Sequence, residues 1–109
     1  MSKAKAATYD EGKPAFAHLP WGGLLAVCEV QAYGHEKYKD FNNYRKGMEV
    51  TRNLSCALRH IVAWLCGQDN DPESGKSHLG HAAARILFVL QNQHDGTAID
   101  DRFKMPTKA

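Results

Sequence analysis

The stretch SHLGHAAARILFVLQNQ, residues 77–93, decides the fold. Apolar side chains recur along it from Leu79 to Leu90 with a period close to 3.6 residues, which is typical of an amphipathic helix. Ser77 stands at the N-cap position, where its hydroxyl can accept a hydrogen bond from the backbone of the first turn. The stretch therefore predicts a helix over residues 78–93 whose apolar stripe packs against other helices.

Two further helices are predicted before this one. Residues 48–66 carry an apolar face, and Gly67 is suited to end the helix. Residues 21–37 are apolar on nearly all sides, which predicts a helix buried among others. The chain contains no alternating run that is typical of a strand. The fold is therefore predicted to be all-α, a compact bundle of three main helices. Because two neighbours cannot cover the first helix completely, we expect an oligomer.

The polar segments divide the chain around this bundle. Residues 1–18 are predicted to form a flexible polar arm, residues 19–94 the helical domain, and residues 95–109 an extended polar tail. Two polar loops, residues 38–47 and 68–76, separate the three helices.

Length and composition exclude several classes of protein. A chain of 109 residues, 43% of them hydrophobic, is sufficient for one domain with a modest core. Its 14 Lys and Arg against 12 Asp and Glu give a net charge of +2, so neither an acidic tail nor specific binding to nucleic acid is expected. Three Cys without C-x-x-C spacing predict neither a disulfide framework nor a zinc-thiolate site.

The chain also lacks signals for membranes and for the best-known enzyme loops. No run approaches the roughly 18 consecutive apolar residues of a membrane span, and the first residues lack the apolar core of a signal peptide. The expected location is therefore the cytoplasm. Walker A, G-x-G-x-x-G, G-x-S-x-G and H-E-x-x-H motifs are all absent from the sequence.

Glu29 is the first candidate functional residue. It is the only charged side chain between Trp21 and Tyr33. A lone carboxylate on a buried helix has to be paired, protonated or bound to a cation, because an unpaired buried charge is costly. The alternative is a partly exposed Glu29 that pairs with Lys or Arg of a neighbouring helix.

The third helix contains the clearest functional pattern. His78, His81 and Arg85 are spaced i, i+3 and i+7, which places them on one stripe of the helix. Two imidazoles can hold a metal ion or contact a phosphate, and Arg binds phosphate through two hydrogen bonds. Asp71 and Glu73 precede the helix, where they can join the imidazoles in a cation site or complement the helix N-terminus. A solvated face that happens to contain His is the alternative.

Two other segments carry cations. Arg59 can reach a phosphate or pair with Glu29 or Asp71, and His60 can be a core histidine or a ligand. The loop after the first helix mixes aromatic rings with cations, which suits a nucleotide because rings stack on a base and cations meet phosphates. The same loop also suits a Tyr packed on the bundle. Its candidate residues are Lys37, Tyr38, Asn43, Tyr44, Arg45 and Lys46.

A set of short motifs resembles a known family. They are Asp10-x-Gly12-Lys13-Pro14, Leu19-Pro20, Lys37-Tyr38, Asn43-Tyr44-Arg45-Lys46-Gly47, Ala57-Leu58-Arg59-His60, Gly67-x-x-x-Asp71-x-Glu73-Ser74-Gly75-x-x-His78-Leu79-x-His81-Ala82-Ala83 and Asp100-Asp101-Arg102. With a central Glu29 in the first helix, this order resembles the small phage and bacterial dATP/dGTP diphosphohydrolase domain. That domain is related to the MazG-like all-α nucleoside triphosphate pyrophosphohydrolases. The resemblance covers residues 9–103, and residues 58–83 are its most specific part.

The resemblance implies an activity and a site. It implies hydrolysis of nucleoside triphosphates, expected to be dGTP or dATP, to the monophosphate and pyrophosphate, with Mg²⁺ or Mn²⁺, in a dimer or tetramer. The implied catalytic residues are Glu29, Asp71, His78 and His81, and the implied metal ligands are these four and Glu73. The implied substrate-binding residues are Lys13, Lys37, Tyr38, Asn43, Tyr44, Arg45, Lys46, Arg59, His60 and Arg85.

The metal-ligand pattern of the wider group is not complete in this sequence. That group carries E-x-x-E on one helix and E-x-x-D on another, whereas Glu29 is followed at i+3 by Ala32 and the third helix carries His78-x-x-His81. The alternative function is therefore a small helical binding or adaptor protein that keeps the fold without the catalysis.

Overall fold

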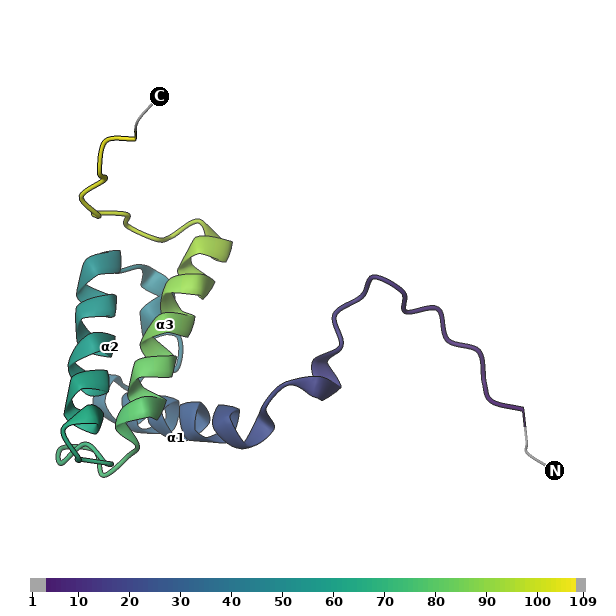
Figure 1. Cartoon of the computed structure of the whole chain (residues 1–109), viewed down its shortest axis with the longest axis horizontal. Helices are drawn as coiled ribbons and strands as arrows, with labels where there is room; N and C mark the ends of the chain where they lie inside the picture. The colour runs from purple at the N-terminus through teal and green to yellow at the C-terminus, as the bar shows by residue number, and fades with distance from the viewer. Residues whose placement is uncertain (1–3, 108–109) are drawn as a thin grey trace.

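The computed structural model describes residues 4–107 and has the predicted all-α fold. Its three main helices are α1 (Trp21–Tyr38), α2 (Val50–Leu65) and α3 (His78–Asp95). Two short 3₁₀ helices, η1 (Phe16–His18) and η2 (Asn43–Lys46), lie before and after α1. In Figure 1, α2 and α3 lie side by side, and α1 crosses one end of the pair. Within the described residues no extended strand forms, and only two isolated bridges join extended segments.

Helix α3 is the central element, since it packs against α2, α1 and η2. Its N-terminus is capped as predicted, because the Ser77 hydroxyl accepts a hydrogen bond from the Gly80 backbone at 3.1 Å. Gly80 also allows α1 to approach closely, since a Cβ atom there would lie 3.1 Å from the carbonyl oxygen of Ala26. At the other end, Gly96 takes the left-handed conformation that commonly terminates a helix.

The hydrophobic core within the single chain is small. Its buried apolar side chains are Val30, Val50, Ala57, Ala82, Ala84 and Val89. The first helix was expected to be buried among others, and that expectation is wrong for the single chain. Only Val30 of α1 is buried, and Trp21 and Leu25 are 56% and 59% exposed. The reason is that α1 packs mainly against α3, which leaves its outer side without a neighbour.

The two terminal segments differ in how they contact the bundle. Residues 4–19 extend away from the helices (Figure 1), and their contact with α1 is a hydrogen bond from Trp21 Nε1 to the Ala17 carbonyl at 3.3 Å. After α3 the chain returns to the start of α2. There Ile99 pairs with Glu49, and the Asp101 carboxylate accepts hydrogen bonds from the backbone and hydroxyl of Thr51 at 3.0 and 2.6 Å. Asp101 therefore caps α2 from a distant part of the sequence.

A helix that could cross a membrane would need a long and strongly apolar stretch. None of the helices among residues 4–107 has one.

Candidate functional site

A cavity of about 280 Å³ lies between α1, η2, α2 and α3. Several titratable side chains line it, among them Lys37, His60, Asp71, Glu73, His81 and Arg85, together with aromatic rings. Three of its residues, His81, Arg85 and Phe88, occupy one side of α3 at spacings of four and three. The cavity therefore runs along α3, with a polar end at His81 and an aromatic end at Phe88.

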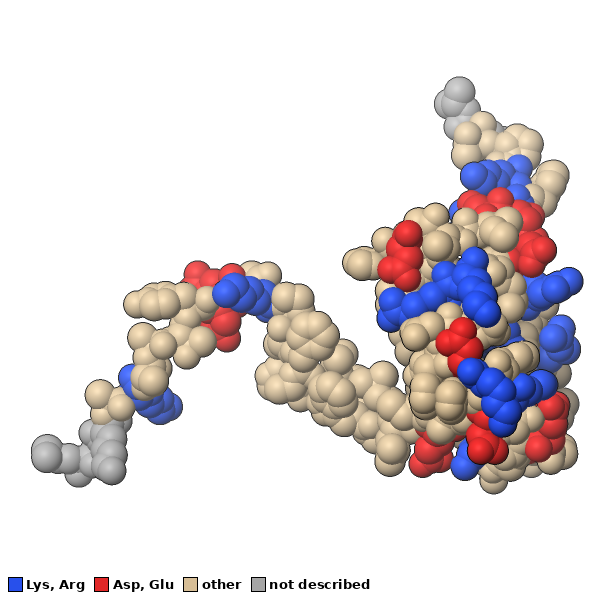
Figure 2. Space-filling model, turned by 180° about the vertical axis from the view of Figure 1, so that it is seen from behind, with Lys and Arg blue, Asp and Glu red and all other residues tan. Residues whose placement is uncertain are grey.

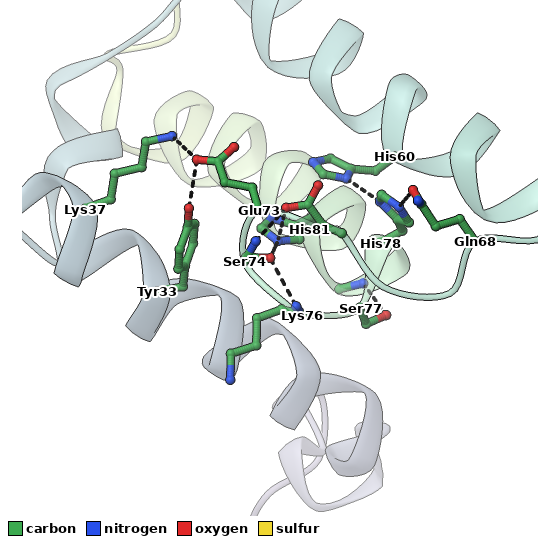
Figure 3. Close-up of polar contacts among 12 residues, drawn as sticks. Tyr33, Lys37, His60, Gln68, Glu73, Ser74, Lys76, Ser77, His78 and His81 are labelled. Atoms are coloured by element: carbon green, nitrogen blue, oxygen red, sulfur yellow. Dashed lines mark hydrogen bonds and ion pairs between the residues drawn. The ribbon is translucent and has the colours of Figure 1, made fainter.

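The turn before α3 places its carboxylates at the polar end. Asp71 closes the turn through backbone hydrogen bonds with Lys76 and Gly75 at 2.8 and 2.7 Å, and its carboxylate accepts from the Ser74 backbone at 3.0 Å. Gly75 adopts a positive φ of 70°, a conformation that favours glycine. This tightly bonded turn places Asp71 4.0 Å from His81 of α3 and places Glu73 beside Tyr33 and Lys37 of α1 (Figure 3).

His60 of α2, which lines the cavity, forms a bonded pair with His78 of α3, which does not. His78 is 3% exposed, and its Nε2 lies 2.6 Å from the side-chain oxygen of Gln68. An amide oxygen only accepts hydrogen bonds, so Nε2 of His78 is the donor, and in a neutral imidazole the other nitrogen, Nδ1, then carries the lone pair. That lone pair accepts from His60 Nδ1 at 2.8 Å (Figure 3). Gln68 therefore sets the tautomer of His78.

His81 lies beside this pair and shares the turn's hydrogen bonds. Its ring stacks on that of His60 with centroids 4.5 Å apart, and its Nε2 lies 2.6 Å from the Ser74 hydroxyl. The hydroxyl accepts from the backbone of Lys76, so its proton is free to be donated to His81. The carboxylate of Asp71 lies 4.0 Å from His81 Nε2.

Burial and hydrogen bonding set the charges of this cluster. Burial lowers the pKa of His60 and of His81, so both imidazoles are neutral at pH 7 and have lone pairs to offer. Burial raises the pKa of Asp71, but hydrogen bonds from Ser74 and the nearby imidazole of His81 lower it more, and the net pKa is below its ordinary value. The cluster therefore combines neutral imidazoles with a carboxylate anion.

Three groups of the cluster are placed so that they could hold a metal ion. One ligand atom each from His60, Asp71 and His78 lie within 4.8 Å of one another. Two imidazole nitrogens and one carboxylate oxygen are suited to Mn²⁺ and other first-row metals, whereas Mg²⁺ prefers oxygen ligands. The hydrogen bond from His78 to Gln68 is the kind of outer contact that orients a metal-bound histidine. The residues present therefore fit a transition metal better than Mg²⁺.

Glu73 is held by two side chains of α1 across the cavity opening. One of its oxygens accepts hydrogen bonds from the Tyr33 hydroxyl at 2.8 Å and the Lys37 ammonium at 3.0 Å (Figure 3). The bond to Lys37 holds the pKa of Glu73 below its usual value, and the bond to Glu73 raises the pKa of Tyr33. Both Lys37 and Glu73 are largely exposed, so this ion pair contributes little to stability.

Arg85 supplies a positive charge within the cavity. Its guanidinium donates to the side-chain oxygen of Asn53 at 3.1 Å, and Asn53 is fully buried. Among residues 4–107 no carboxylate lies within ion-pair distance of Arg85. A partly buried guanidinium without a carboxylate is suited to binding an anion such as phosphate.

Comparison with known proteins identifies the family. A family model described as dATP/dGTP diphosphohydrolase, N-terminal, matches residues 3–102. The chain belongs to this family. A dATP/dGTP diphosphohydrolase of Salmonella phage PMBT28 is 29% identical over 94 residues, which are 86% of this chain and 32% of that protein. The chain therefore spans about a third of the length of this relative. No solved structure matches the chain.

The structure separates the residues that the sequence had grouped. The cavity is lined by the predicted residues Lys37, Tyr38, Asn43, Tyr44, His60, Asp71, Glu73, His81 and Arg85. His78 lies behind them, bonded to His60. Five predicted residues lie outside the cavity: Lys13, Glu29, Arg45, Arg59 and Lys46.

The reasons for these five placements differ. Lys13 is on the N-terminal arm, and Arg59 is on the exposed side of α2. Arg45 pairs with Asp95, and Lys46 pairs with Asp40.

In the view from behind, Lys and Arg lie over much of the body, with Asp and Glu among them (Figure 2).

Glu29 is exposed in the single chain rather than buried, so the expectation of a buried lone carboxylate is wrong. The cavity lining on α1 begins at Val30 and continues toward the C-terminal end of the helix. Glu29 lies four residues, about 6 Å of helical rise, before Tyr33, the first α1 residue of the polar cluster. No interaction with Arg59 or another cation is among the ion pairs of the described residues.

Sequence reasoning missed several residues of the site. Gln68, Ser74 and Asn53 each fix the position of a functional side chain, yet none of them is charged or aromatic. Ser74 stands inside the motif Asp71-x-Glu73-Ser74-Gly75, so its turn geometry offered a signal. Gln68 and Asn53 offered none, because their partners are 10 and 32 residues away in the chain.

Proposed function

We propose that this domain hydrolyses purine deoxynucleoside triphosphates, dATP or dGTP, to the nucleoside monophosphate and pyrophosphate. Family membership and the name of the phage relative support this proposal. The observation that carries it is the cavity itself, which brings a carboxylate and imidazole cluster together with two cations, Lys37 and Arg85. This combination suits phosphoryl chemistry, since catalysis depends on positioning the phosphates and stabilising their charge.

We propose that the reaction depends on a divalent metal ion. His60, His78 and Asp71 would hold Mn²⁺, and carboxylates such as Asp71 and Glu73 would hold Mg²⁺ together with the substrate phosphates. A divalent cation, when bound, neutralises phosphate charge and lowers the pKa of a coordinated water.

The residues around this cluster have separate roles in the proposal. Arg85 binds phosphate oxygens from the floor of the cavity, where Asn53 fixes its position. Lys37 binds phosphate at the opening and exchanges its contact with Glu73 for one with the substrate. His81 is neutral because burial lowers its pKa, and its Nε2 would accept a proton from an attacking water in exchange for the hydrogen bond that it accepts from the Ser74 hydroxyl.

We also propose that the protein acts as a homo-oligomer in the cytoplasm, where deoxynucleotides are its substrate. Large apolar side chains of α2, among them Leu58, Val62 and Leu65, are 56–70% exposed. Exposed apolar groups of this size on a small domain mark an interaction surface. A second copy that covers them would also enlarge a core that contains six buried apolar residues among those described.

The test of the proposed function is the rate of pyrophosphate release from dGTP and dATP, with Mn²⁺, Mg²⁺ or EDTA. We expect release with a metal and none with EDTA. Asp71→Asn should lower kcat/KM by at least about 100-fold, because it removes the anionic member of the cluster. The surface variant Asp10→Asn, on the N-terminal arm, is the matched control and should keep the wild-type rate. A folded protein that turns over neither nucleotide would refute the proposal and favour a non-catalytic binding protein.

A further inference from the structure

The outer side of α1 is an apolar surface that its own chain leaves uncovered. Along it lie Trp21, Leu25, Cys28 and Ala32, which follow one another at spacings of four, three and four residues. All four are exposed, whereas Val30, on the opposite side of the helix, is buried. This outer side therefore has the apolar stripe of a helix that packs against a neighbour.

The exposed side of α2 carries a second apolar surface. Its residues Leu58, Val62 and Leu65 are spaced four and three apart, and each is more than half exposed. These three side chains and those of Trp21 and Leu25 each leave on the order of 100 Å² exposed. A specific interface buries at least about 1,000 Å² in total. Two copies that cover both surfaces of each other reach this area with these side chains alone.

The charges beside the two surfaces are opposite. The outer side of α1 carries the exposed carboxylates Glu29 and Glu36, while Lys37 lies on the cavity side. The exposed side of α2 carries Arg52 and Arg59, and α2 contains no Asp or Glu. Neither these carboxylates nor these guanidiniums belong to an ion pair within residues 4–107. The two surfaces are therefore complementary in charge.

The spacing of the charges also matches between the two helices. The two carboxylates of α1, Glu29 and Glu36, are seven residues apart, and so are the two arginines of α2, Arg52 and Arg59. Seven residues of helix rise about 10 Å. When the helices lie antiparallel, pairing Glu29 with Arg59 therefore also pairs Glu36 with Arg52.

The same antiparallel register brings the apolar residues together. Leu25 and Trp21 precede the first carboxylate of α1 by four and eight residues. Val62 and Leu65 follow the second arginine of α2 by three and six residues. In this register Leu25 would therefore lie near Val62, and Trp21 near Leu65. A parallel arrangement with the same charge pairs would place Trp21 beyond the start of α2.

We propose that the outer side of α1 in one copy docks antiparallel on the exposed side of α2 in a second copy. The apolar side chains form the centre of this contact. The pairs Glu29–Arg59 and Glu36–Arg52 lie at its edge and fix the register. The inference rests on the homo-oligomer of the proposed function. It does not require the proposed reaction, because none of these residues lines the cavity.

Reversal of the charges tests the contact. The α1 variant Glu29→Arg/Glu36→Arg places cations against the arginines of α2, and the α2 variant Arg52→Glu/Arg59→Glu places carboxylates against those of α1. Each variant alone should raise the dissociation constant of the oligomer at least about tenfold in sedimentation at micromolar concentration. All four side chains are exposed, so both variants are expected to fold, which circular dichroism verifies.

A mixture of the two variants shows whether the pairs join different copies. In an equimolar mixture the reversed α1 meets the reversed α2, and the unchanged α1 meets the unchanged α2. The mixture should therefore associate with a dissociation constant within about threefold of wild type. The matched control Asp10→Arg/Glu11→Arg makes the same change in net charge as the α1 variant, on the N-terminal arm, and should stay within about twofold of wild type.

The outcomes separate this contact from the proposed function. If the α1 variant associates as wild type does, or if the mixture does not recover, the contact is overturned and the oligomer stands. A wild-type protein that stays monomeric overturns both the contact and the oligomer. The rate of dGTP hydrolysis tests the reaction independently of either result.

Discussion

The substitution Gln68→Met tests the proposal that Gln68 orients His78 as a metal ligand. Among residues 4–107, Gln68 is the one partner that accepts a hydrogen bond from His78 Nε2, at 2.6 Å. A metal ion bound at His78 Nδ1 would replace the hydrogen bond from His60 Nδ1 and requires the proton to remain on Nε2. Methionine has a similar length but cannot accept this bond strongly, so a buried N–H would lose its partner.

The size of the effect follows from the burial of His78, which is 3% exposed. A buried donor that loses its acceptor costs about 1–3 kcal/mol, which corresponds to a factor of about 5–150 in a dissociation constant. Losses of outer-shell partners typically weaken metal binding by about 10–100-fold. We therefore expect the Kd for Mn²⁺ to rise by about 10–100-fold in Gln68→Met.

The assay is titration with Mn²⁺ at pH 7 without nucleotide, with free Mn²⁺ followed by electron paramagnetic resonance. Gln68→Glu provides a stronger acceptor and should bind Mn²⁺ at least as tightly as wild type. Gln91→Met is the matched control. Gln91 lies about 20 Å further along α3 than His78, and its side chain donates to Asp95. A Gln68→Met protein with a Kd within twofold of wild type would show that Gln68 does not orient a metal ligand.

Three further predictions concern stability and assembly. Gly47→Ala should lower the free energy of unfolding by about 2–4 kcal/mol in a urea titration. The reason is that Gly47 has a φ of +97° and that the new Cβ would lie 2.6 Å from the Thr97 carbonyl oxygen. A decrease of less than about 1 kcal/mol would contradict this prediction. Asp101→Ala should lower the melting temperature by roughly 4–8 °C at pH 7, because α2 loses its cap. Hydrogen bonds from Thr51 lower the folded-state pKa of Asp101, so the stabilisation by the cap is complete above about pH 4 and disappears as the pH falls through that pKa. If Asp101→Ala lowered the melting temperature equally at pH 2 and at pH 7, the result would argue against the cap. Val62→Asp should convert an oligomer into a monomer in light scattering at micromolar concentration, and a monomeric wild type would disprove the oligomer.

Local patterns in the sequence were sufficient to predict the three helices. Period, capping and turn residues act within a few positions, so Ser77 and the stripe after it predicted the start of α3 correctly. The same reasoning failed for α1, because an apolar composition shows that a helix needs cover but not whether its own chain provides it. The wrong prediction that Glu29 is buried has the same cause.

The candidate site depends on contacts that no local pattern contains. His60 was open to interpretation as a core histidine or as a ligand, and its bond to His78 spans 18 residues. Asp101 lies in a segment predicted as a polar tail, yet it caps a helix that begins 51 residues earlier. His35 and Phe41 pack together only because α1 ends and the chain turns back there. Non-local pairing of this kind requires the tertiary structure.

The most direct test of the proposed function identifies the products of dGTP in the presence of Mn²⁺ by phosphorus nuclear magnetic resonance. Our proposal predicts equal amounts of dGMP and pyrophosphate from the wild-type protein and unchanged dGTP when EDTA is present. Formation of dGDP and inorganic phosphate, or no reaction in a folded sample, would contradict it.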